Sequence, residues 1–174
     1  MHLKSLIKDR RGAAAVEFAF VAPVMILMYY GLAELTQGMM ADRRASHVAS
    51  AIGDLVAQDT MINSSEMTDI FNVGKAIIAP FPTTGLSMRV TSIRKDSSGG
   101  LQVMWSQSSG SMSVLTTVAS VPANLIANNE SVILAESSYV YNSATKKALP
   151  NALTFSQKYY LKPRKTAQVM WSTS

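Results

Sequence analysis

The sequence contains no cysteine, only two histidines and few charged residues, which make up 16% of its 174 residues. Without cysteine there is neither a disulfide nor a thiolate metal site, and neither redox compartment is favoured. The two histidines, His2 and His47, leave little material for acid–base catalysis. A Ser–His–Asp site would have to use His47 with Asp42 or Asp54, at spacings that do not share one helical face well. We therefore expect His47 to be a solvated or packing residue.

Motifs for nucleotides and metals are missing as well. There is no GxGxxG, no GxxxxGK[ST], no HExxH and no calcium-binding loop. This excludes a motor ATPase or a metalloprotease. We predict a non-enzymatic protein with no catalytic residue, no cofactor and no metal site.

Charge is unevenly placed along the chain. The net charge of +5 comes from two basic ends: four Lys and Arg residues precede residue 12, and six lie within 146–165, which has no acid. The basic stretch 146–165 is suited to binding acidic lipid headgroups, DNA or a protein partner. A solvated edge strand protected by lysines is the simpler interpretation, and we expect no nucleic acid partner.

One apolar segment dominates the N-terminal region. No charge occurs from Phe18 to Ala33, and the 21 residues that start at Ala13 are interrupted only by Glu17. About 20 apolar residues span a bilayer, and a proline such as Pro23 is tolerated in lipid. Because four Lys and Arg residues precede the segment and two follow it closely, we predict a cytoplasmic N-terminus, with the rest of the chain on the other side.

Glu17 makes the fate of this segment an open question, because a carboxylate in a membrane helix costs roughly 2.5–3.5 kcal/mol. The segment could be an uncut bitopic anchor. It could be a secretory signal that is cut after Ala33, which would release a periplasmic binding module. Cleavage after Gly12 would instead leave Ala13 as the new N-terminus and Glu17 as its fifth residue. The new amine could then pair with Glu17 of a neighbouring copy.

The run Gly12–Pro23, GAAAVEFAFVAP, followed by further apolar residues and by Gly31-Leu32-Ala33-Glu34, resembles the start of the TadE/TadG-like proteins. These are pilin-like components of the tight-adherence (Tad, or Flp) type IV pilus of bacteria. The close resemblance covers about residues 10–58, and residues 138–141 and 159–164 are similar more loosely. It implies a minor pilin or pseudopilin in the inner membrane, with its C-terminal domain in the periplasm and a role in pilus assembly and surface attachment.

The resemblance also implies partners and candidate site residues. Some relatives are cut by a prepilin peptidase after a glycine, with a glutamate at the fifth mature position. This maps to Gly12 and Ala13 as the processing site and to Glu17 as the subunit-pairing residue. Other pilin or pilus-assembly subunits would be the partners. The chain departs from the major Flp pilin in its length and in having Glu17-Phe18 instead of a Glu-Tyr pair, which argues against a shaft subunit.

Beyond the apolar segment the pattern predicts an α+β, pilin-like fold. Apolar residues recur at steps of three and four from Leu35 to Val56, so we expect the helix to continue to residue 58. A second helix is expected near Glu66–Ile78, with Ser64 or Ser65 as its N-cap. Alternation predicts a strand at 86–95, and we expect further antiparallel strands at 101–107, 131–141 and 155–162.

The predicted organisation has four parts. They are a basic cytoplasmic leader (1–12), a transmembrane segment (13–33), a helix that continues outside the membrane (34–58) and a periplasmic α+β domain (59–174). Glu34, directly after the transmembrane segment, is expected to be a plain interfacial acid.

Overall fold

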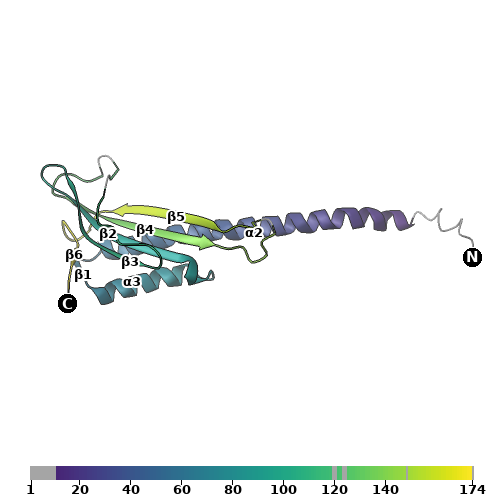
Figure 1. The fold of residues 1–174 in the computed structure, drawn as a ribbon, viewed down its shortest axis with the longest axis horizontal. Coiled ribbons are helices and arrows are strands. Elements are labelled where there is room, and N and C mark those ends of the chain that lie inside the picture. Colours follow the sequence, from purple (N-terminus) through teal and green to yellow (C-terminus); the bar gives the residue numbers. More distant parts are fainter. Residues whose placement is uncertain (1–10, 119–120, 123–124, 148, 174) are drawn as a thin grey trace, which may run out of the picture. The chain divides into compact units, whose positions relative to one another are not determined.

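The computed structural model describes residues 11–118, 121–122, 125–147 and 149–173. This part of the chain contains a long helix, a second helix and a four-stranded antiparallel sheet (Figure 1), so the predicted α+β class is confirmed. The chain divides into two compact units. The helix–loop unit joins the described residues up to Gly38 with Asn142–Ala152. The sheet unit holds the described residues of Met39–Tyr141 and Leu153–Ser174.

Helix α2 (Arg11–Ala57) is continuous over 47 residues and contains Pro23. It ends one residue before the predicted end. At this end the backbone N–H of Arg164 donates to the Ala57 carbonyl at 2.8 Å, and the Arg164 guanidinium binds Asp54. A cation and a donor at a helix C-terminus satisfy carbonyls that have no partner within the helix. Most of the predicted leader, residues 1–10, lies outside the described residues.

The main sheet has the order β3-β2-β4-β5, and all its neighbours are antiparallel. Its strands are β2 (Leu86–Lys95), β3 (Leu101–Ser109), β4 (Ser131–Tyr141) and β5 (Leu153–Leu161). β2 and β4 have the predicted bounds, whereas β3 ends two residues later and β5 begins two residues earlier than predicted. A short 3₁₀ helix, η1 (Thr83–Gly85), leads into β2.

A small parallel pair, β1 (Met61–Ile62) with β6 (Met170–Trp171), was not predicted. Two residues are too few to show an alternating pattern. Next to this pair, Trp105 is buried, its ring lies 5.6 Å from that of Trp171, and its indole N–H donates to the Val169 carbonyl at 2.9 Å. These contacts attach the C-terminal segment to β3.

Helix α3 (Ser64–Ile77) begins two residues earlier than predicted, and its expected N-cap was wrong. Asn63 is the cap: its side chain accepts from the Glu66 backbone N–H at 2.9 Å, while the Glu66 carboxylate accepts from the Asn63 N–H at 3.0 Å. This reciprocal pair is a capping box. Asparagine is as good a cap as serine, and Glu66 at the third helical position selects it over the serines that follow.

The inner face of the sheet packs against the C-terminal half of α2 and against α3. The Ser137 hydroxyl of β4 donates to the Ala45 carbonyl of α2 at 2.7 Å. Gly53 of α2 lies against β4 and β5, and Gly74 of α3 lies against Met88 of β2. The largest fully buried side chains include Val48, Ile52, Ile62, Ile78, Met88, Val90 and Ile133. The core of the sheet unit therefore includes part of the same helix that carries the apolar segment.

The outer face of the sheet carries a second apolar cluster and a buried ion pair. The cluster contains Ile93, Val132, Leu134 and Ile126, and partly buried residues between β3 and β4 pack against it. Beside it, Glu136 is only 2% exposed and contacts Arg89 at 2.5 Å and Lys158 at 3.1 Å. A buried carboxylate needs such partners, because burial without them is strongly destabilising.

Candidate functional site

The first half of α2 presents apolar side chains to the outside. Phe18 is 72% exposed and Leu32 is 67% exposed. The helix contains an 18-residue window with a mean hydropathy of 1.8 and no buried residue, which is long and apolar enough to cross a membrane. Exposed apolar surface of this extent marks a membrane or protein contact rather than a surface that faces water.

The two residues of the predicted processing site lie in the first turn of α2. Gly12 and Ala13 are both exposed, and a Cβ built on Gly12 would meet no atom within 4 Å. No described part of the chain therefore covers the peptide bond between them. The rival cleavage position, after Ala33, lies inside the continuous helix and is followed by a buried residue, Glu34.

Glu17, the predicted subunit-pairing residue, lies a little more than one turn after Gly12 and is exposed. Among the residues that the structure describes, none makes a hydrogen bond or ion pair with its carboxylate. No compensating group for this acid lies among the described residues, although exposed apolar side chains surround it.

Glu34 differs from the plain interfacial acid that the sequence suggested, because it is 3% exposed and holds a distant loop. One carboxylate oxygen accepts from the backbone N–H of Lys147 at 2.9 Å and from the Thr145 hydroxyl. The other accepts from the backbone N–H of Leu149 at 2.7 Å. Backbone amides that converge on a carboxylate satisfy its charge without a cation. The expectation was wrong because these donors lie more than 110 residues further along the chain.

A small hollow lies between this loop and α2, beside the contacts of Glu34. Its volume is about 120 Å³, and it is lined from the helix by Tyr29, Tyr30, Ala33, Glu34 and Gln37, and from the loop by Ser143, Ala144 and Thr145. The rings of the two tyrosines meet edge to face, with their centroids 6.1 Å apart. The loop and the end of the apolar segment therefore form one local surface.

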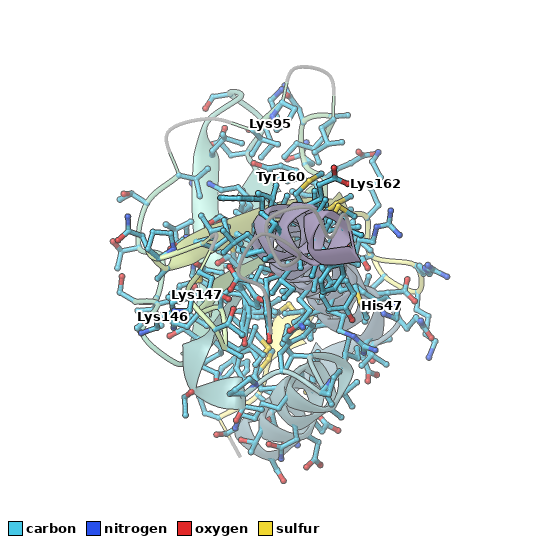
Figure 2. The ribbon with its side chains drawn as sticks, turned by 90° about the vertical axis from the view of Figure 1, so that its right-hand side faces the viewer. His47, Lys95, Lys146, Lys147, Tyr160 and Lys162 are labelled. Carbon is cyan, nitrogen blue, oxygen red and sulfur yellow. The ribbon has the colours of Figure 1, made fainter. Side chains whose placement is uncertain are left out.

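The polar residues further along α2 do not form a catalytic site around His47, which is exposed on the helix (Figure 2). The Asp42 carboxylate accepts instead from the Gln157 side chain at 2.8 Å. Asp54 binds the guanidinium of Arg164. Within the described ranges, no three His, Asp or Glu side chains come together as metal ligands would.

The basic stretch at 146–165 is divided between the two units. In the sheet unit, Lys158 and Lys162 extend from edge strand β5 or its end, and each makes an ion pair: Lys158 with Glu136, and Lys162 with Glu130 at 2.8 Å. In the helix–loop unit, Lys146 and Lys147 are exposed in the loop that Glu34 holds (Figure 2).

Comparison with known families gives a match for the long helix. Residues 12–53 match the family model described as TadE-like protein. Over these residues the chain is similar to that family. The resemblance found in the sequence is thereby confirmed, and no curated protein and no solved structure matches the chain.

The TadE-like segment contains all three candidate positions, Gly12, Ala13 and Glu17, and it ends at Gly53, where α2 packs on the sheet. It also contains Glu34, whose role sequence reasoning missed. The only signal available was an acid directly after the apolar segment, since loop 142–152 has no pattern that points back to the helix. The family match leaves residues 54–174 unassigned.

Proposed function

We propose that the chain is a non-enzymatic, membrane-anchored TadE/TadG-like minor pilin or pseudopilin that acts in the assembly of a Tad/Flp-type pilus. The observation that carries this proposal is the exposed apolar half of α2 within a TadE-like segment. Residues 13–33 insert into the bacterial inner membrane, with the N-terminus in the cytoplasm and the sheet unit in the periplasm. The sheet unit then presents contacts to other pilin subunits or to the assembly machinery.

Glu17 is the residue through which subunits associate in this proposal. A prepilin peptidase removes residues 1–12, and the new amine of Ala13 pairs with Glu17 of a neighbouring subunit. The exposed carboxylate without a described partner supports this step, as does the uncovered Gly12–Ala13 bond. Such a pair offsets the cost of placing a carboxylate in the membrane, so it favours stacked helices over single ones.

A Glu17→Ala variant tests the pairing step. We expect normal membrane insertion but a yield of assembled pili that is lower by about tenfold or more, the effect of losing ~1.4 kcal/mol per subunit contact. The measurements are immunoblotting of the membrane fraction and quantification of sheared pili. Leu32→Ala is a matched control, since it also changes one exposed position of the same helix. Unchanged piliation in the Glu17 variant would refute the pairing role.

N-terminal sequencing of the mature protein separates this proposal from its alternatives. A start at Ala13 supports processing and assembly. A start at Met1 indicates an uncut bitopic envelope scaffold of the same machinery. A start at Glu34 indicates a released periplasmic module, which the buried position of Glu34 within α2 argues against.

A further inference from the structure

Loop Asn142–Ala152 is attached to α2 directly beyond the apolar segment. Its attachment is the Glu34 carboxylate, which accepts the backbone N–H groups of Lys147 and Leu149. If residues 13–33 span the bilayer, as proposed above, Glu34 lies at the membrane surface, and the loop must lie there too. This inference therefore rests on the proposed membrane anchor.

The loop presents two cations at this position. Lys146 and Lys147 are exposed, and no described carboxylate makes an ion pair with either ammonium group. The nearby acid, Glu34, is covered and accepts from the loop's own donors. The Lys147 backbone is fixed at 2.9 Å from Glu34, so its side chain cannot leave the neighbourhood of the helix.

The helix adds residues that are typical of the interface between lipid and water. Tyr29 is 71% exposed and Tyr30 is 43% exposed, and both line the hollow below Ala144 and Thr145. Tyrosines concentrate at the level of the headgroups, where their rings are in an apolar layer and their hydroxyls reach water. With the proposed anchor, the tyrosines of the helix and the lysines of the loop are thus both placed near the depth where lipid phosphates lie.

The backbone holds the two lysines in a defined arrangement. Lys146 has a φ of 53°, which is uncommon for a residue other than glycine, and its N–H donates to the buried Ser143 hydroxyl at 3.3 Å. A single exposed lysine on a free loop would be unremarkable. Here two consecutive lysines are held against the helix by a buried carboxylate.

We propose that loop 142–152 binds the headgroups of anionic phospholipids in the same bilayer that α2 spans. Lys146 and Lys147 contact the phosphates, while Glu34 is a positioning residue that keeps the loop at the surface. Each lysine near an anionic surface is attracted to it electrostatically. Together the two lysines favour the lipid-bound loop over the unbound loop by roughly thirtyfold. The loop is therefore a second attachment to the membrane, and it limits rotation and vertical movement of the helix.

The test uses the full chain in lipid nanodiscs and a fluorescent reporter on the loop. Because the chain has no cysteine, Ala144→Cys gives one labelling site, which carries an environment-sensitive NBD dye. We compare nanodiscs of phosphatidylcholine alone with nanodiscs that contain phosphatidylglycerol. The expected result is blue-shifted emission and reduced quenching by acrylamide, a neutral quencher that the lipid charge does not repel, with the anionic lipid. Both effects should be reversed by high salt because the contact is electrostatic.

The Lys146→Gln/Lys147→Gln variant is expected to lose this dependence on lipid composition. Lys75→Gln/Lys95→Gln removes the same charge from the sheet unit and is the matched control, which keeps the dependence. Equal spectra in both lipids, or a dependence that survives in the loop variant, would overturn the inference while leaving the anchor intact. Failure of the chain to enter nanodiscs at all would overturn the membrane anchor, and this inference with it.

Discussion

Two glutamates on α2 have opposite surroundings, although both lie at an end of the same apolar segment. Glu17 is exposed and has no described partner, whereas Glu34 is buried beneath a loop that supplies its hydrogen-bond donors. An acid that is satisfied within its own chain has no free capacity for a neighbour. The first glutamate is therefore suited to contacts between subunits, and the second to the structure of a single subunit.

Replacement of Glu34 by alanine should release loop 142–152. The variant leaves the backbone N–H groups of Lys147 and Leu149 without their acceptor, which costs about 1–3 kcal/mol and favours opening of the loop. We expect trypsin to cleave after Lys146 or Lys147 about tenfold faster or more. Glu17→Ala, which removes an exposed carboxylate from the same helix, should leave the cleavage rate unchanged. Equal rates in the two variants would contradict the role assigned to Glu34.

At the scale of elements, the C-terminal half of α2 packs closely on the sheet because it has glycine at position 53. A Cβ at this position would lie 2.5 Å from Leu161 Cδ1 and 2.7 Å from Ala135 Cβ. Leu161 can rotate away, but Ala135 cannot, since its Cβ is fixed to strand β4. From the sequence alone, Gly53 is expected only to weaken the helix. The structure shows that the missing side chain lets α2 lie close to Ala135 and Leu161 of the sheet.

A Gly53→Ala variant should therefore be less stable despite the better helix propensity of alanine. Propensity contributes about 1 kcal/mol in favour of the variant, and overpacking costs typically 1–3 kcal/mol. We expect a net loss of up to about 2 kcal/mol in the free energy of unfolding, measured by urea titration of the full chain in detergent. Gly12→Ala is the matched control, because its Cβ meets no atom within 4 Å and it should not lower stability. A midpoint for Gly53→Ala at or above that of the native chain would show that the sheet adjusts.

Most elements could be predicted from local pattern, and the exceptions have physical causes. The strand at 86–95 follows from alternation, the strand at 131–141 has the bounds expected from the sequence, and α2 follows from its apolar spacing. The pair β1–β6 is too short to leave a pattern, and the cap of α3 depends on a reciprocal contact with Glu66. The loop on Glu34 is a contact between distant residues, which no local pattern records.

At the scale of the whole molecule, acid should destabilise the fold through two surface carboxylates. A hydrogen bond from the Ser98 hydroxyl, followed by one from the Gly100 amide, lowers the pKa of Asp96. Hydrogen bonds from Lys162 and then from the Ala127 amide lower the pKa of Glu130. Because folding lowers both pKa values, the two carboxylates contribute to the free energy of unfolding above the ordinary carboxyl pKa of about 4. This contribution is lost as the pH falls through the lowered pKa values.

The urea midpoint should therefore be level between pH 7 and pH 5 and should fall below about pH 4. In an Asp96→Asn/Glu130→Gln variant the midpoint should be lower at pH 7 and should fall less on acidification. Lys162→Gln serves as the control. It removes the hydrogen bond that is the largest cause of the lowered pKa of Glu130, and it leaves the hydrogen bonds of Asp96 unchanged. The same slope in the native chain and the double variant would show that other groups determine the acid response.

The contact between Ala45 and Ser137 has a consequence for the order of synthesis. The helix residue is made first, and the strand residue that covers it follows 92 residues later. At the usual rate of about 5–20 residues per second, the ribosome needs roughly 5–20 s to supply β4 after this part of α2 has been made. During this interval the apolar face from Ala41 to Val56 has no β4 to cover it, although the exposed apolar half of α2 is already complete. A newly made chain thus exposes this apolar face for several seconds, and such transiently exposed apolar surface is prone to aggregation.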